Sequence, residues 1–135
     1  MSTVFVNGCF DVLHRGHIEL FKYAKSLGNY LLVALDSDDR IKDHKGDSRP
    51  HNNIDDRKAI LSSIKFIDEV TCFSSDTELE NIIKKFSPDN MVVGSDWRDK
   101  KVIGSQYAKN VVFFERIDGY STTRTIQSLS SRRYL

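Results

Sequence analysis

Two histidines three positions apart are the side chains best suited to chemistry in this chain. His14 and His17 have Gly16 between them and lie at the start of a segment with helical periodicity. A helix N-terminus presents free backbone N–H groups and a partial positive charge, which favour phosphate. Imidazoles donate to phosphate oxygens and stabilise charge that builds on a leaving group. The spacing predicts a phosphate site; the alternative is that one histidine caps the helix and the other packs.

The residues before the histidines lead out of an apolar run. Gly8 suits a tight turn, and Gly16 would let a phosphate approach the backbone closely. Cys9 is either a reactive thiol or a small buried side chain. The whole stretch reads Asn7-Gly8-Cys9-Phe10-Asp11-Val12-Leu13-His14-Arg15-Gly16-His17.

Three later polar stretches also follow apolar runs. Residues 42–52 are rich in lysine, arginine and histidine, and could hold an anionic substrate or form a solvated loop. Residues 94–97, Gly-Ser-Asp-Trp, could shape a pocket, although Trp97 could instead anchor packing. Near the C-terminus, hydroxyls at a predicted helix start form a second phosphate-binding corner. Arg116 adds a bidentate donor there that helix capping does not explain.

The elements that must position these residues alternate between apolar runs and helix-period segments, as in a parallel α/β sheet. In the second helix Ile60, Leu61 and Ile64 are expected to face the core, and residues 36–53 are expected to be loop. We predict a single domain over residues 1–135, a doubly wound Rossmann-like sandwich with a five-stranded parallel sheet. Ligands then bind at the carboxyl ends of the strands, near the topological switch point. The predicted strands are 3–7, 30–35, 69–73, 91–93 and 111–114; the helices are 17–27, 54–64, 77–86 and one from about 122.

Composition narrows the classes of partner. The chain has 135 residues with 20 basic and 19 acidic side chains, a net charge of +1, which disfavours nucleic acid and membrane surfaces as partners. No apolar run approaches the roughly 20 residues that span a bilayer, and no signal peptide is visible, so a cytoplasmic protein is expected. Cys9 and Cys72 lack metal-ligand spacing, and no protein-held metal site is predicted.

The string Gly8-x-Phe10-Asp11-x-x-His14-x-Gly16-His17 resembles the signature of the cytidylyltransferase-like nucleotidyltransferases, whose hallmark is H-x-G-H. The resemblance extends over essentially the whole chain. It implies transfer of a nucleoside monophosphate from a triphosphate to a small phosphorylated acceptor, in one in-line step that releases pyrophosphate. It also implies Mg²⁺ arriving with the nucleotide, and a homodimer. The sequence agrees in showing no serine, cysteine or lysine nucleophile with a paired base.

The resemblance also implies residue roles. The residues expected to be catalytic are His14, His17, Lys45 and Arg116. Those expected to bind the nucleotide are Gly8, Cys9, Phe10, Asp11, Gly16, Asp96, Gly119, Ser121 and Thr122. Those expected to bind the acceptor are Lys42, Arg57 and Trp97, with an exposed helix charge as the alternative for Arg57.

Two subfamilies share these motifs. The R-x-x-G-x-S-T-T string at residues 116–123, Asp96-Trp97 and the short length resemble CTP:glycerol-3-phosphate cytidylyltransferases, which is the reading favoured here. Residues 7–11, 45–50 and 102–105 resemble ATP-using heptose-1-phosphate adenylyltransferase domains, which are often fused to a sugar kinase. An alternative from another class is a non-catalytic nucleotide-binding module. Such a module would be expected to lose a histidine of H-x-G-H, and both are present.

Overall fold

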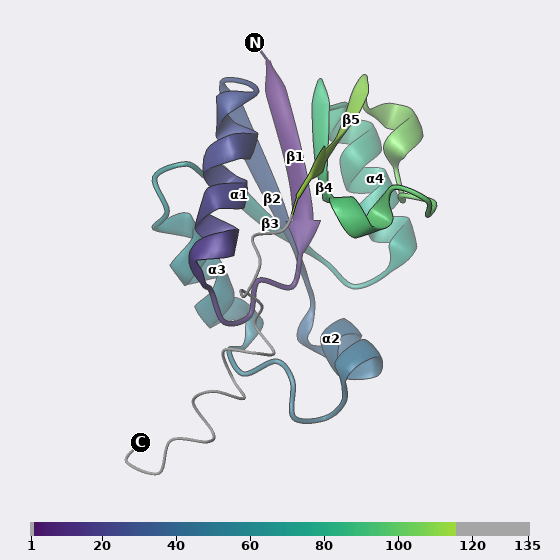
Figure 1. The fold of residues 1–135 in the computed structure, drawn as a ribbon. Helices are drawn as coiled ribbons and strands as arrows, with labels where there is room; N and C mark the ends of the chain where they lie inside the picture. The colour runs from purple at the N-terminus through teal and green to yellow at the C-terminus, as the bar shows by residue number, and fades with distance from the viewer. Residues whose placement is uncertain (1, 116–135) are drawn as a thin grey trace.

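The computed structural model describes residues 2–115, which form a five-stranded, all-parallel sheet in the order β3-β2-β1-β4-β5 (Figure 1). The inner strand β2 is buried along nearly its whole length, as expected for a parallel strand covered on both faces. The predicted fold class is confirmed. The strands are β1 Thr3–Gly8, β2 Tyr30–Asp36, β3 Glu69–Phe73, β4 Asn90–Gly94 and β5 Asn110–Phe114.

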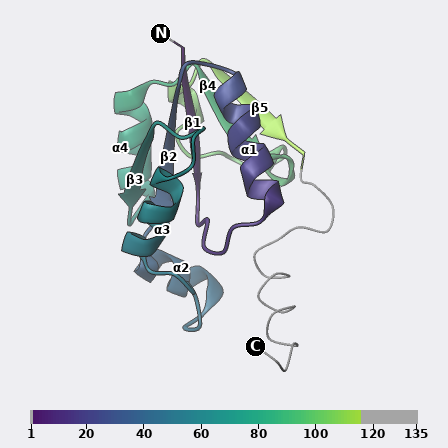
Figure 2. The same ribbon diagram turned by 90° about the vertical axis from the view of Figure 1, so that its left-hand side faces the viewer.

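Helices pack on both faces of the sheet (Figures 1 and 2). The α1 and α3 side packs on alternate strand residues such as Val4 and Val6, while the α4 side packs on Phe5 and Leu32. Side chains that alternate across a strand therefore build two separate apolar layers. The helices are α1 Arg15–Ser26, α2 Asp38–Lys45, α3 Ile54–Ser62 and α4 Asp76–Phe86, with short 3₁₀ turns η1 Ser95–Trp97 and η2 Ser105–Tyr107.

The strand order sets where a ligand can bind. The chain runs from β1 outward through β2 to β3, and then returns to β4 on the other side of β1. Connections after β1 and β4 therefore leave in opposite directions, which opens a crevice at the carboxyl ends of these two strands. Helix α2 lies beyond that edge of the sheet (Figure 1).

Two structural expectations were wrong. Residues 38–45 form α2 rather than a loop: the Ser37 side chain accepts from the backbone N–H of Arg40, acidic residues occupy the first turn and Gly46 ends the helix at φ 94°. Only Ile41 of α2 is buried, so the helix has almost no apolar stripe for periodicity to detect. Ile60 was expected to face the core but is 43% exposed, whereas Leu61 is fully buried. The predicted helix from about residue 122 lies outside the described residues.

Candidate functional site

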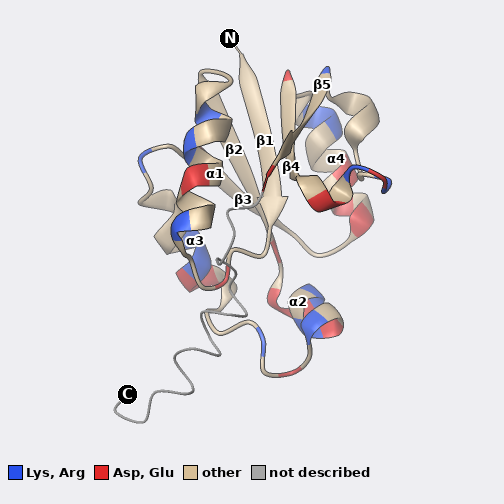
Figure 3. Cartoon of the chain, in the orientation of Figure 1, with Lys and Arg blue, Asp and Glu red and all other residues tan. Residues whose placement is uncertain are grey.

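A cavity of about 410 Å³ lies at the carboxyl ends of β1 and β4, at the topological switch point. Its volume falls in the range of small-molecule sites, roughly 300–1,000 Å³. Residues Asn7–Phe10 and Gly94 line it where the strands end, and α2 contributes the basic residues Arg40 and Lys45. Figure 3 shows that α2 carries both basic and acidic side chains. The cavity combines an apolar interior with a few cations at one wall.

His14 and His17 are held together at the start of α1. Their rings stack with centroids 3.8 Å apart, and the His14 backbone N–H donates to Nδ1 of His17 at 3.2 Å. Because Nδ1 accepts this bond, Nε2 carries the proton in a neutral His17 ring. Gly16 lies between them in the first turn of α1. His14 ends the loop that leaves the cavity and His17 lies in the first turn of α1, but neither belongs to the cavity lining itself.

The Phe10 ring packs against His17 of this histidine pair. Phe10 adopts a left-handed backbone conformation at φ 46°, and its ring meets His17 edge-on with centroids 5.5 Å apart. The same ring packs on Phe21 in the core, and a Cβ at Gly8 would approach it to 3.0 Å. The Phe10 ring is therefore mostly a support for the loop, although the residue also borders the cavity.

Asp11 was expected to bind the nucleotide, but its side chain is fully buried. Its Oδ2 accepts from the backbone N–H of His51 at 2.7 Å, and its Oδ1 accepts from that of Asn52 at 2.8 Å. Burial acts to raise the pKa of Asp11, but the bonds from Asn52, His51 and Arg49 outweigh it and lower the pKa below its ordinary value. In this structure the carboxylate fixes the loop before α3, so nucleotide contact is not the role that its geometry supports.

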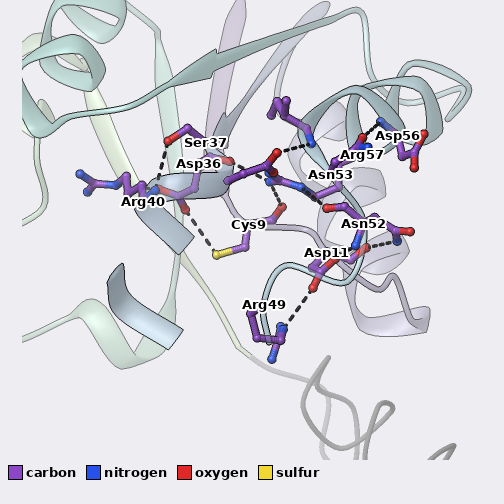
Figure 4. Close-up of polar contacts among 12 residues, drawn as sticks. Cys9, Asp11, Asp36, Ser37, Arg40, Arg49, Asn52, Asn53, Asp56 and Arg57 are labelled. Atoms are coloured by element: carbon purple, nitrogen blue, oxygen red, sulfur yellow. Dashed lines mark hydrogen bonds and ion pairs between the residues drawn. The ribbon is translucent and has the colours of Figure 1, made fainter. Parts of the chain in front are cut away.

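Arg57 differs from both expectations for it, because it is neither at an open acceptor site nor an exposed helix charge. It is fully buried, and it donates to the carbonyls of Asn52, Cys9 and Asp36 at 2.8–3.0 Å. Its Nη2 also pairs with Oδ1 of Asp38 at 2.7 Å. Figure 4 shows this arginine between the loops that follow β1 and β2. Arg57 therefore positions the two loops that border the cavity.

Cys9 lines the cavity beside Asp36, with its Sγ 3.4 Å from Oδ2 of Asp36. Burial, and then the negative charge of Asp36, raise the pKa of the Cys9 thiol, while Lys45 acts in the opposite direction. A thiol with a raised pKa is a poor nucleophile at neutral pH. The geometry thus favours a packing and lining role for Cys9 over a reactive one.

Sequence reasoning missed Asp36 and Arg40, which both line the cavity. Arg40 Nε pairs with Asp36 Oδ1 at 2.8 Å, and its Nη2 pairs with Asp76 at 2.6 Å. Asp36 is the last residue of β2, so the rule that ligands gather where parallel strands end could have found it. Finding Arg40 would have required the prediction of α2, because that helix places Arg40 four residues, or about one turn, after Asp36.

The other candidates divide between the cavity and its surroundings. Lys45 and Trp97 line the cavity, and Trp97 is 44% exposed with Lys100 Nζ 5.3 Å from its ring centroid. That exposure argues against a packing anchor. Lys42 is exposed on α2, and Asp96 is exposed on η1 with its carboxylate over Gly94; neither lines the cavity. Four candidates lie outside the described residues: Arg116, Gly119, Ser121 and Thr122.

Residues 2–115 contain no group of three or more histidine, cysteine or acidic side chains arranged to hold a metal ion. Within the same range, no helix combines the length and apolar character needed to cross a bilayer.

A parallel α/β sheet with a cavity at its switch point, and a histidine pair at the first helix N-terminus, is the arrangement of the doubly wound α/β proteins that bind ligands at the carboxyl ends of their strands. Residues 5–128 match the family described as Cytidylyltransferase-like. The chain belongs to this family of nucleotidyltransferases, as the resemblance in the sequence implied.

Relatives of known name are close in sequence but much longer. The chain is 45% identical over 128 residues to the "Bifunctional protein HldE" of Campylobacter fetus, covering 95% of this chain and 28% of that protein. The protein of the same name from Helicobacter hepaticus is 44% identical, with 95% and 26% covered. The chain thus spans little more than a quarter of the length of these relatives.

Solved structures share the fold. A lipopolysaccharide core biosynthesis protein from Thermoplasma volcanium aligns with a TM-score of 0.69 at 26% identity, over 90% of this chain and 99% of that one. A pantothenate synthetase from Thermus thermophilus aligns with a TM-score of 0.60 at 12% identity, over 87% of this chain and 56% of that one, a likeness of fold alone.

Proposed function

We propose that this chain is an adenylyltransferase that transfers AMP from ATP to the phosphate of heptose-1-phosphate and releases pyrophosphate. The observation that carries the proposal is the His14–His17 pair, fixed at the N-terminus of α1 beside the switch-point cavity. Helix dipole, backbone N–H groups and two imidazoles together favour the negative charge that develops on a leaving pyrophosphate.

The relatives support ATP and a sugar phosphate over the CTP and glycerol-3-phosphate that the sequence favoured. The adenylyl resemblance implies a domain often fused to a sugar kinase. The named relatives are bifunctional, and the matched segment is 28% of the Campylobacter fetus protein, as such a fusion requires. The Thermoplasma volcanium neighbour is named for lipopolysaccharide core biosynthesis, which also fits a sugar substrate.

In the proposed reaction an oxygen of the acceptor phosphate attacks the α-phosphorus of ATP. The new P–O bond forms as the bond to the β-phosphate oxygen breaks, and pyrophosphate leaves with the electron pair. The protein contributes position and charge stabilisation, as in other phosphoryl transfers. Lys45 at the cavity wall would neutralise phosphate charge, while Arg57 and Asp11 hold the surrounding loops. Mg²⁺ arriving with ATP would help to neutralise the charge of the triphosphate, as is usual where substrate phosphates supply part of the coordination.

A pyrophosphate-release assay with ATP or CTP against heptose-1-phosphate or glycerol-3-phosphate tests the proposal. We expect ATP with heptose-1-phosphate to exceed every other pair in kcat/KM by at least about tenfold, because a buried polar edge left unpaired with the wrong base costs about 1–3 kcal/mol. A preference for CTP with glycerol-3-phosphate would overturn the substrate assignment and leave the reaction class intact. Binding of nucleotide without release from any pair would instead support the non-catalytic module.

A further inference from the structure

Arg49 lies in the loop between α2 and α3, and its side chain is only 12% exposed. Its Nε donates to Oδ2 of Asp11 at 3.1 Å. Its Nη2 is buried and has no hydrogen-bond partner among residues 2–115. Buried donors of this kind are rare in folded proteins, and each calls for an explanation such as a ligand that is bound in another state.

The same region contains a buried guanidinium, that of Arg57, whose three nitrogens all have acceptors in the protein. All three nitrogens of Arg57 donate to protein oxygens: Nε to one carbonyl, Nη1 to two, and Nη2 to Asp38. The Arg49 side chain has a single hydrogen bond to residues 2–115, the one from Nε to Asp11. Arg57 is fully buried and the Arg49 side chain is 12% exposed, but Nη2 of Arg49 is itself buried, so what it lacks is an acceptor from the fold.

The carboxylate of Asp11 does not form a two-point pair with Arg49. A two-point arginine–carboxylate contact would place Nη2 on the second oxygen of Asp11. That oxygen, Oδ1, instead accepts from the Asn52 backbone N–H at 2.8 Å, and Oδ2 accepts from the His51 backbone N–H at 2.7 Å as well as from Arg49 Nε. Asp11 therefore fixes the direction of the guanidinium through Nε and leaves Nη2 open (Figure 4).

We propose that Nη2 of Arg49 binds a phosphate oxygen of a substrate. Arginine presents a rigid fork of donors that matches phosphate, and its partner Asp11 lies three residues before His14 in the same loop. The bound ligand would supply the acceptor that the fold withholds. Which phosphate is bound, that of the nucleotide or that of the acceptor, rests on the proposed function; the anion site itself does not.

Equilibrium binding distinguishes the phosphate of the nucleotide from the phosphate of the acceptor. Isothermal titration calorimetry would compare the wild type, Arg49→Met and the matched control Lys58→Met, an exposed cation on α3. The probes are ATP with Mg²⁺, heptose-1-phosphate, and adenosine, which has no phosphate. We expect Arg49→Met to weaken at least one phosphate ligand by about tenfold or more, the effect of one charge-assisted hydrogen bond, with adenosine and the Lys58→Met variant unchanged.

The ligand whose affinity falls in the Arg49→Met variant identifies which phosphate Arg49 binds. Unchanged affinity for both phosphate ligands in a folded Arg49→Met variant would overturn the proposal. If circular dichroism shows that this variant does not fold, the side-chain Nε–H signal of Arg49 in ¹⁵N-labelled wild type, assigned with Arg49→Lys, is followed during the same titrations. A shift of that signal with either phosphate ligand supports the site, and no shift at saturating or millimolar ligand contradicts it. Neither the calorimetry nor the NMR titration measures turnover. The result can therefore be interpreted even if the proposed reaction is not observed.

Discussion

Arg49, in the loop between α2 and α3, and Arg57, on α3, are two arginines with little or no exposed surface, yet their surroundings differ in kind. Arg57 is enclosed by four protein acceptors that belong to three separate segments of the chain. Arg49 is held by one carboxylate oxygen and keeps a buried nitrogen without a partner in residues 2–115. A closed set of partners indicates a structural role, whereas an open donor indicates a ligand. The low exposure of the two side chains would not by itself reveal that Arg49 and Arg57 have different roles.

The largest expected effect is loss of Arg57. Arg57→Met removes the donors of three carbonyls and leaves Asp38 without its partner, so the free energy of unfolding should fall by about 3–5 kcal/mol. Urea denaturation measures this, and Lys58→Met, an exposed neighbour, should stay within about 0.5 kcal/mol of wild type. If both variants are equally stable, the contacts that Arg57 makes with the surrounding loops do not stabilise the fold.

Asp11 links the two arginine environments, and its removal should have a smaller effect. Asp11→Asn places an amide where two backbone N–H groups and Arg49 donate, which should cost about 2–3 kcal/mol. The measurement is urea denaturation at neutral pH. A change within error would show that the carboxylate charge contributes nothing to the loop.

The pH dependence of Asp11 has a defined sign. Because the folded-state pKa is below the ordinary value of 3.8, the stabilisation is complete above that pH and is lost as the pH falls toward the folded-state pKa. Asp11→Asn should therefore flatten the fall in stability below about pH 4. Asp68 and Asp89, whose pKa values are also lowered, would keep a residual slope. An unchanged acid profile would contradict the assigned shift.

Arg49→Met should change stability less than either substitution. It removes one bond to Asp11 but also removes a buried donor without a partner, and Asp11 keeps both backbone bonds. We expect a loss of about 1 kcal/mol in urea denaturation without ligand. A loss as large as that of Arg57→Met would remove the distinction between the two arginines.

The smallest expected effect concerns the reactivity of the Cys9 thiol, which lies next to the contacts of Arg57. Arg57 Nη1 holds the carbonyl of Cys9, whose thiol has a raised pKa, whereas Cys72 is exposed. Alkylation by iodoacetamide at neutral pH, followed by mass spectrometry, should modify Cys72 before Cys9. Faster modification of Cys9 would show that its loop opens readily or that its thiolate is stabilised.

The sheet and the histidine pair were predictable because their signals are local. Apolar runs marked every strand, and the H-x-G-H spacing marked the start of α1. Helix α2 was missed because it buries only Ile41, although its capping residues Ser37 and Gly46 were visible in the sequence. Weight on caps rather than on periodicity would have found it.

The roles of Arg57 and Asp11 were not predictable in the same way. Arg57 binds the backbone carbonyls of Cys9 and Asp36, which are distant in sequence and available in any residue type. Asp11 likewise accepts from backbone N–H groups of His51 and Asn52. Main-chain partners leave no pattern in a sequence, so only the tertiary structure distinguishes these charges from ligands of a substrate.

The central proposal is that the histidine pair beside the switch-point cavity promotes transfer of AMP to a sugar phosphate. The most direct test is the rate of pyrophosphate release from ATP with saturating heptose-1-phosphate, for the wild type and His17→Ala. The account predicts release that requires both substrates in the wild type, and a fall of at least about a hundredfold in a folded His17→Ala variant, the usual cost of losing one charge-stabilising donor. Equal rates in the two proteins would contradict it.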